Sequence, residues 1–209
     1  MATSSDRIPT GKLGRTVSYP LNGIMVTRGI GINNKKRSKP QLTVMQKTKV
    51  TSRFLQPVMA YLKIGYGIEA RRQKAHAQNP AFLYHWKNAM KGEYPHIEVD
   101  YEKVLMTTGL LPKPEAVGIS IGSEGLNFSW NPESIEGLAH WTDQSMMIAY
   151  FPELDTAQFV TAGANRYIGK DFLPLNLEKK NTIMELYLSF ISSDRQSISD
   201  SVYAGQFHW

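Results

Sequence analysis

The chain has 209 residues, of which 42% are hydrophobic, and it carries 24 Lys/Arg against 18 Asp/Glu, a net charge of +6. This length and composition are those of a globular protein with a substantial core, not of a disordered chain. The absence of cysteine excludes disulfides, thiolate nucleophiles and cysteine-ligated metals.

The charges are distributed unevenly along the chain. Residues 1–92 contain 17 Lys/Arg and 2 Asp/Glu, whereas residues 93–209 contain 7 Lys/Arg and 16 Asp/Glu. This split predicts two electrostatically different parts. Either they attract each other, within one chain or between copies, or the basic part faces an acidic partner such as nucleic acid.

The N-terminal region is predicted to contain a β-hairpin over residues 11–31. Residues 15–19 and 24–28 tend to alternate apolar and polar side chains, and Asn22-Gly23 between them supplies the positive φ angles of a tight turn. Because an isolated two-stranded hairpin is only marginally stable, we expect it to lie against its own chain or a neighbour. A basic loop over residues 32–40 follows.

Two helices are predicted next. Apolar residues recur at helical spacing over residues 41–64. Pro57 is expected to kink or divide this helix, because it lacks a backbone donor, and Gly65 and Gly67 are expected to end it. A second, shorter helix is predicted over residues 81–90.

From residue 97 the hydrophobic period changes to two, which predicts a half-buried strand over residues 97–102. Further short strands are separated by turn residues, a rhythm typical of an antiparallel sandwich. These strands are predicted at residues 104–107, 116–121, 126–130, 144–151, 158–162, 166–171, 182–192 and 203–207.

The predicted fold class is therefore α+β, with an N-terminal β-hairpin and helices followed by an antiparallel β-sandwich. We expect three parts along the chain. These are a basic hairpin-plus-helix region at residues 1–92, a strand and linker at residues 93–114, and the sandwich domain at residues 115–209.

The C-terminal part resembles a fibronectin type III or immunoglobulin-like sandwich over about residues 115–207. The resemblance rests on an inward Trp130 on an early strand, on the core strand 146–150, and on the late strand 183–190 with Tyr187. It implies a scaffold and no particular activity, because such sandwiches host many functions.

Several stretches spread along the chain form a distinctive pattern. They are Gly11-Lys12-Leu13-Gly14, Asn22-Gly23 with Val26 and Arg28, Gln46 through Phe54-Leu55, Ile64-Gly65-Tyr66, and the stretch from Ser197 to Gly205. In these stretches, nearly the whole chain resembles a family of Bacteroidota proteins of unknown function. The resemblance implies no activity and no catalytic residues.

Basic residues in segment 28–53 form the strongest local signal. A phosphate backbone or an acidic protein surface would suit them, although no zinc-finger spacing or RNP sequence accompanies them. The candidate contact residues are Arg28, Lys35, Lys36, Arg37, Lys39, Lys47, Lys49 and Arg53.

No residue pattern points to catalysis. None of the five histidines has the His-x-x-x-His or Glu-x-x-His spacing of a metal site, no pair of carboxylates is singled out, and no glycine-rich segment has a phosphate-loop form. We therefore expect no enzymatic activity, no metal and no cofactor.

The expected function is that of a structural or adaptor protein whose basic N-terminal arm engages protein partners or copies of itself, as in phage-like assemblies. The alternatives are a nucleic-acid-binding protein that uses residues 28–53, and a carbohydrate- or peptide-binding sandwich. Trp209, the last residue, is a possible anchor in a groove of this chain or of a partner. With no apolar run of signal-peptide or membrane-span length, we expect a cytoplasmic protein or a component of an assembled particle.

Overall fold

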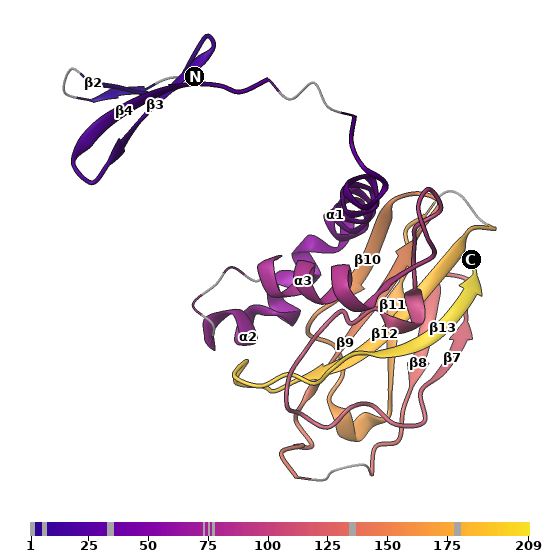
Figure 1. Cartoon of the computed structure of the whole chain (residues 1–209). Coiled ribbons are helices and arrows are strands. Elements are labelled where there is room, and N and C mark those ends of the chain that lie inside the picture. The colour runs from indigo at the N-terminus through magenta and orange to yellow at the C-terminus, as the bar shows by residue number, and fades with distance from the viewer. Residues whose placement is uncertain are drawn as a thin grey trace. The chain divides into compact units, whose positions relative to one another are not determined.

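The structure is a computed structural model that describes residues 3–5, 8–32, 36–72, 74, 76, 78–133, 137–177 and 181–209. The chain folds into two compact units, an N-terminal unit, Met1–Ser38, and a second unit, Lys39–Trp209, which we call the body. Figure 1 shows the elements of both.

The N-terminal unit is a four-stranded antiparallel sheet in chain order, here called the N-terminal sheet. Asn22 and Gly23 join the last two strands with φ angles of 51° and 79°. The predicted hairpin is thus confirmed, but its two preceding strands were missed. The strands are β1 (Thr3–Ser5), β2 (Ile8–Leu13), β3 (Thr16–Leu21) and β4 (Ile24–Gly29).

Three helices follow: α1 (Lys39–Gly65), α2 (Gly67–Arg72) and α3 (Gln78–Asn88). The prediction for residues 41–64 is confirmed, but α1 continues through Pro57 as one helix. Phe54 and Val58, on either side of the proline, are buried, and this burial offsets the lost backbone bond. The short α2 was missed, because Gly65 and Gly67 were read as a stop.

The body contains two larger antiparallel sheets, of order β10-β9-β12-β13 and β11-β8-β7, and a small β5-β6 pair. The four-stranded sheet comprises β9 (Gln144–Phe151), β10 (Thr156–Val160), β12 (Ile183–Ile191) and β13 (Val202–His208). The remaining strands are β5 (Met90–Lys91), β6 (Glu98–Val99), β7 (Gly118–Ile121), β8 (Gly125–Ser129) and β11 (Lys170–Pro174).

Alternate side chains of β9 and β12 enter two separate cores. Met146 and Ile148 pack with the buried residues of α1, whereas Met147 and Phe151 pack with β8 and β11. The body therefore has three layers: helices, the four-stranded sheet and the three-stranded sheet (Figure 1). This arrangement confirms the α+β class, while the immunoglobulin- or fibronectin-like type stays a prediction.

Several boundaries differ from the expected ones. The strand predicted at residues 97–102 is limited to β6 and is followed by a 3-10 turn, Tyr101–Lys103. The segment predicted at residues 166–171 begins with another 3-10 turn, Arg166–Ile168, before β11. The two compact units divide after Ser38, and α1 and α3 share one core of the body with the four-stranded sheet. Within the described residues, no helix is long and apolar enough to cross a membrane.

Candidate functional site

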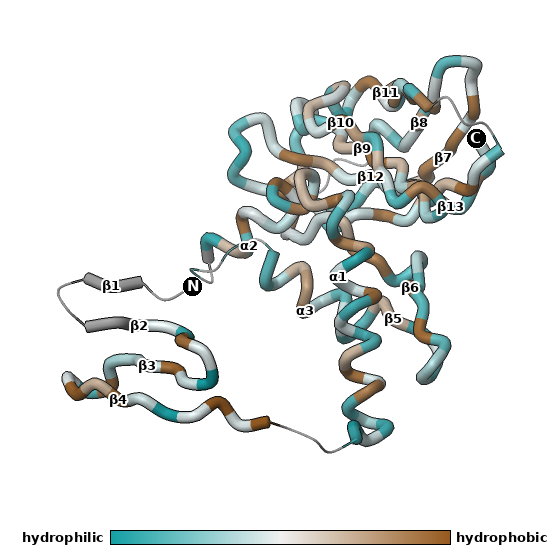
Figure 2. Tube along the Cα trace, turned by 90° about the horizontal axis from the view of Figure 1, so that it is seen from above, coloured by the Kyte–Doolittle hydropathy of each residue, from teal (hydrophilic) through white to brown (hydrophobic). Residues whose placement is uncertain are grey.

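The two faces of the N-terminal sheet differ in composition. Residues opposite each other on paired strands share a face, so the pairs Val17–Arg28, Tyr19–Val26 and Leu21–Ile24 place six side chains on one face. Figure 2 shows the hydrophobic residues of β3 and β4 in brown. This face is therefore apolar and carries a cation.

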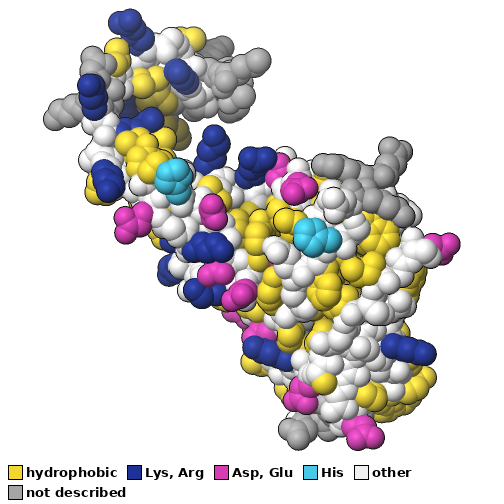
Figure 3. All heavy atoms as spheres, turned by 90° about the vertical axis from the view of Figure 1, so that its right-hand side faces the viewer, with side chains coloured by type: hydrophobic (Ala, Val, Ile, Leu, Met, Phe, Trp, Pro, Cys, Tyr) yellow, Lys and Arg dark blue, Asp and Glu magenta, His cyan; other side chains and the backbone are white. Residues whose placement is uncertain are grey.

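Arg28 lies over an aromatic ring on this face. Its Cζ atom is 5.7 Å from the centroid of the Tyr19 ring, within the range of a cation–π contact. Lys12 of β2 is paired with Val17, so it shares the face as well. The face can therefore offer apolar contact and positive charge to the same partner (Figure 3, yellow beside dark blue).

None of residues 10–32 is buried in the structure. On the apolar face, Leu21 and Ile24 are 52% and 70% exposed; Leu13, whose pairing with Thr16 places it on the other face, is 69% exposed. Stable sheets normally bury one face against a second layer, and the described part of the N-terminal unit provides no such layer. An exposed apolar sheet face of this kind is typical of a surface that another protein covers.

The net charge of the whole chain resides in the N-terminal unit. Met1–Ser38 contains seven Lys/Arg and one Asp, whereas the body contains 17 Lys/Arg and 17 Asp/Glu. A compact unit with a net charge of +6 attracts acidic surfaces and repels copies of itself.

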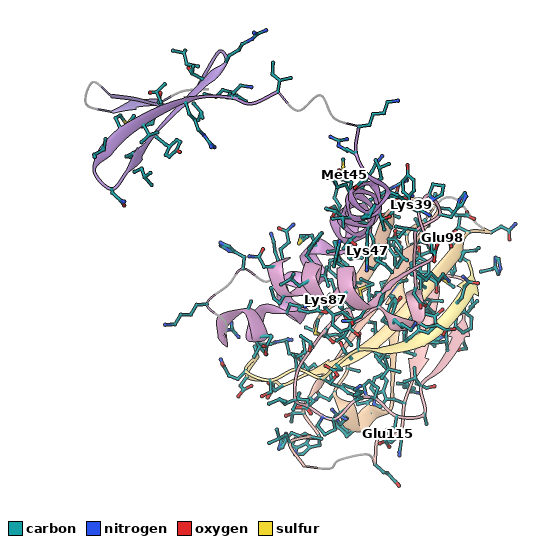
Figure 4. All side chains as sticks on the ribbon, in the orientation of Figure 1. Lys39, Met45, Lys47, Lys87, Glu98 and Glu115 are labelled. Carbon is teal, nitrogen blue, oxygen red and sulfur yellow. The ribbon has the colours of Figure 1, made fainter. Side chains whose placement is uncertain are left out.

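The predicted basic residues are divided between the two units, so the structure does not bring them together as one site. Lys35 lies outside the described residues. Arg28, Lys36 and Arg37 are exposed in the N-terminal unit. The other four, Lys39, Lys47, Lys49 and Arg53, belong to α1; Figure 4 labels Lys39 and Lys47.

Two of the four α1 cations are engaged within the body. The Lys47 Nζ atom lies 4.5 Å from the centroid of the Trp86 ring. Arg53 Nη2 lies 2.5 Å from Asp155 Oδ2, and this hydrogen bond, together with the charge of Asp155, raises the pKa of Arg53 above its ordinary value. Lys39 and Lys49 are exposed.

A groove of about 440 Å³ opens beside Arg53, between α1, the β5–β6 pair and β13. Its lining includes Tyr101, Tyr150 and Gln206. Burial, with the nearby charge of Asp155, raises the pKa of Tyr150 to about 12. Its phenol is therefore protonated at neutral pH, where it can donate a hydrogen bond but does not act as a base.

A fully buried carboxylate lies next to this groove. Glu185 Oε2 accepts a hydrogen bond of 2.7 Å from the Tyr203 hydroxyl, and Oε1 accepts one of 2.7 Å from Gln206 Nε2. No local sequence pattern marks the groove, because its residues come from segments far apart in the chain. Among the described residues, no group of three or more His, Cys, Asp or Glu side chains is placed to hold a metal ion.

Trp209 lies on its own chain. The side chain is half-buried and packs against the core between the two larger sheets. Its backbone N–H donates a 2.9 Å hydrogen bond to the Thr182 carbonyl, and its carbonyl accepts one from the Asn181 N–H. These contacts fit the first of its two predicted roles, an anchor in a groove of this chain.

Comparison with known proteins places the chain in a family without assigning it an activity. No curated protein and no solved structure matches it. The sequence model of a family of unknown function (DUF6266) matches residues 8–205, while an origin in Bacteroidota stays a prediction. The chain therefore belongs to the DUF6266 family.

Proposed function

We propose that this protein is a non-catalytic structural or adaptor protein whose N-terminal sheet engages protein partners, and that the first partner is another copy of the same chain. The observation that carries the proposal is the sheet itself, which has an apolar face and no buried residue among residues 10–32. Burying such a face against a second layer is strongly favourable.

The charge distribution favours an acidic surface as that second layer. The N-terminal unit has a net charge of +6, and residues 93–209 contain 16 Asp/Glu against 7 Lys/Arg. Glu93, Glu98 and Glu102 are exposed in that region. The charges would orient the contact and speed association, while the apolar face supplies most of the binding free energy.

Nine residues, 30–38, separate β4 from α1 in the sequence. A chain segment of that length can span up to about 30 Å, which would allow the sheet to bind a neighbouring molecule. The free edge of β4 adds main-chain donors and acceptors, so that strand addition is a second mode of contact.

In this proposal the body is the scaffold, in the cytoplasm or within an assembled particle. We propose an immunoglobulin- or fibronectin-like type for its two packed sheets. The Trp130 ring supports this assignment, because it is buried in the core between them with its centroid 5.4 Å from that of Phe190.

Nucleic acid is the alternative partner, which the exposure of Arg28, Lys36 and Arg37 supports. Phosphate contacts would make binding fall steeply with salt and would not require the apolar face. Salt dependence and nuclease sensitivity therefore distinguish nucleic-acid binding from self-association.

Light scattering of the nuclease-treated protein at several concentrations tests the proposal. The triple variant Arg28→Gln/Lys36→Gln/Arg37→Gln should raise the dissociation constant of the assembly by about tenfold or more, which corresponds to roughly 1.4 kcal/mol. The matched control Lys39→Gln/Lys49→Gln/Lys170→Gln removes the same charge from the body and should change it little. A chain that stays monomeric at all concentrations contradicts self-association, and a chain that carries nuclease-sensitive nucleic acid points to the alternative.

A further inference from the structure

A second cavity, separate from the N-terminal unit, lies where the end of α1 and the start of α2 meet the ends of β10 and β12. It is a cleft of about 340 Å³. The volume lies at the lower end of the range of small-molecule sites, roughly 300–1,000 Å³. The cleft is lined by Lys63, Ile64, Gly67, Ile68, Arg71, Thr161, Ile191 and Arg195.

The side chains of the cleft combine one sign of charge with an apolar floor. Three of its eight residues are basic and none is acidic. Among the ion pairs formed by described residues, none involves Lys63, Arg71 or Arg195. An anion in the cleft would be attracted by all three cations.

Arg195 is held in a fixed orientation by neutral groups. Its Nη1 donates a 3.0 Å hydrogen bond to the Thr161 carbonyl, and its Nη2 donates a 2.6 Å hydrogen bond to Gln144 Oε1. Its backbone has a φ of 60°, a conformation that residues other than glycine rarely adopt. A guanidinium that is positioned in advance loses little freedom when it binds an anion.

The nearby acceptors are already occupied. Asp194 Oδ1 accepts hydrogen bonds from Ser192 Oγ and from the Gln196 N–H, which lower the pKa of Asp194 and keep it in its own turn. In the last turn of α1, the Leu62 carbonyl accepts from Tyr66 N–H and the Gly65 carbonyl from Thr108 N–H. Asp194 also lines a different pocket, and no ion pair between described residues joins it to Lys63, Arg71 or Arg195.

We propose that this cleft binds a small organic anion, a carboxylate or phosphate monoester on a short apolar body. Arg195 binds the charged group, Lys63 and Arg71 flank it, and Ile64, Ile68 and Ile191 contact the apolar body. The site is independent of the self-association described above, since all its residues belong to the body.

Titration calorimetry of the full chain with four ligands of equal length tests the proposal: octanoate, octyl phosphate, octanol and octylammonium, each below its micelle concentration. The two anions should bind at least about tenfold more tightly than octanol, a typical value for a charge-assisted contact, and octylammonium should not bind. A preference between the two anions identifies the headgroup. Equal affinity for octanol, or no binding of either anion, overturns the proposal.

Substitutions in the cleft test whether the ligand binds there. Arg195→Gln should weaken octanoate at least tenfold, and Lys63→Gln about threefold, whereas Lys49→Gln, on an exposed part of α1, should leave affinity unchanged. If Arg195→Gln does not fold, the double variant Lys63→Gln/Arg71→Gln decides, because both side chains are exposed. Unchanged affinity in that double variant places the ligand elsewhere and contradicts the assignment.

Discussion

Arg166 and Asp143 form a buried ion pair in the body, with Arg166 Nε 3.3 Å from Asp143 Oδ2 and side chains that are 1% and 2% exposed. The Arg166 Cζ atom lies 3.9 Å from the centroid of the Phe190 ring, and its Nη2 donates to the Pro112 carbonyl. Burial lowers the pKa of Arg166, and the charge of Asp143 opposes that effect. The pair thus joins two loops to the core between the sheets.

Breaking this pair should cost much more than replacing it. Asp143→Asn removes the carboxylate that pairs with the buried Arg166 guanidinium, and we expect a loss of about 3–5 kcal/mol in the free energy of unfolding. The double variant Asp143→Asn/Arg166→Met should recover part of that loss, because neither charge of the pair remains. Urea unfolding of the two variants checks this expectation, which would be wrong if the double variant were the less stable one.

His85 should make folding stability depend on pH. Burial lowers the pKa of His85 to about 4, and its Nδ1–H donates a 2.7 Å hydrogen bond to the Ala81 carbonyl. The unfolded chain takes up a proton near pH 6.5, whereas the folded chain does so only near pH 4. Stability is therefore lost as the pH falls from about 6.5 to 4, by about 3 kcal/mol in total.

The variant His85→Phe should lack that contribution, since Phe keeps the ring contact with Phe54, whose centroid is 5.5 Å away. Urea unfolding at pH 7.0 and pH 4.5 measures the difference. Wild type should lose about 2–3 kcal/mol more than the variant over this interval. Equal losses would show that His85 does not titrate differently in the folded chain.

Alanine substitution should have opposite effects on stability at two glycines of the α1–α2 junction, Gly65 and Gly67. A Cβ on Gly65 would collide with the Met106 carbonyl oxygen and lie 2.8 Å from Thr107 Cγ2, whereas one on Gly67 would meet no atom within 4 Å. We expect Gly65→Ala to cost about 2 kcal/mol or more, and Gly67→Ala to be neutral or to stabilise by up to about 1 kcal/mol. Thermal unfolding of both variants compares them, and similar melting temperatures would contradict the packing at Gly65.

Trp209→Ala separates the two roles considered for the last residue. If the indole packs against the core of its own chain, the variant should lose roughly 2 kcal/mol in the free energy of unfolding, about half the cost for a fully buried aromatic ring. The mass of the assembly in solution should then stay unchanged. His208→Ala is the matched control, because His208 is exposed and adjacent. An unchanged unfolding free energy with a lost assembly would assign Trp209 to a partner instead.

Local sequence patterns predicted the turns, helices and strands whose formation depends mainly on neighbouring residues. Asn22-Gly23 located the β3–β4 turn, helical periodicity located α1, and the apolar run at residues 144–151 matches β9 in full. β2 was missed because Pro9 and Gly11 are unfavourable in strands; in the structure Pro9 pairs with Ser4 of β1, whereas Gly11, with a φ of 107°, pairs with Ser18 of β3.

Features that depend on tertiary contacts were not predictable in this way. The unbroken apolar run of β9 indicates a strand covered on both faces, but the sequence does not show that α1 covers one of them. The same holds for the proposed anion cleft, where Lys63 ends one helix and Arg195 lies in a turn far along the chain. The charge count identified residues 1–92 as basic, although the net charge of the whole chain equals that of the compact unit Met1–Ser38 alone.

Hydrogen exchange of the backbone amides of residues 16–29, measured at protein concentrations above and below the dissociation constant, tests the central claim most directly. If the N-terminal sheet is the assembly surface, exchange in β3 and β4 should slow by about tenfold or more at high concentration, because a bound sheet opens less often. The variant Arg28→Gln/Lys36→Gln/Arg37→Gln should lose that protection. Exchange in residues 16–29 that stays fast at every concentration, while the mass of the protein rises, would show that the chain assembles through another surface.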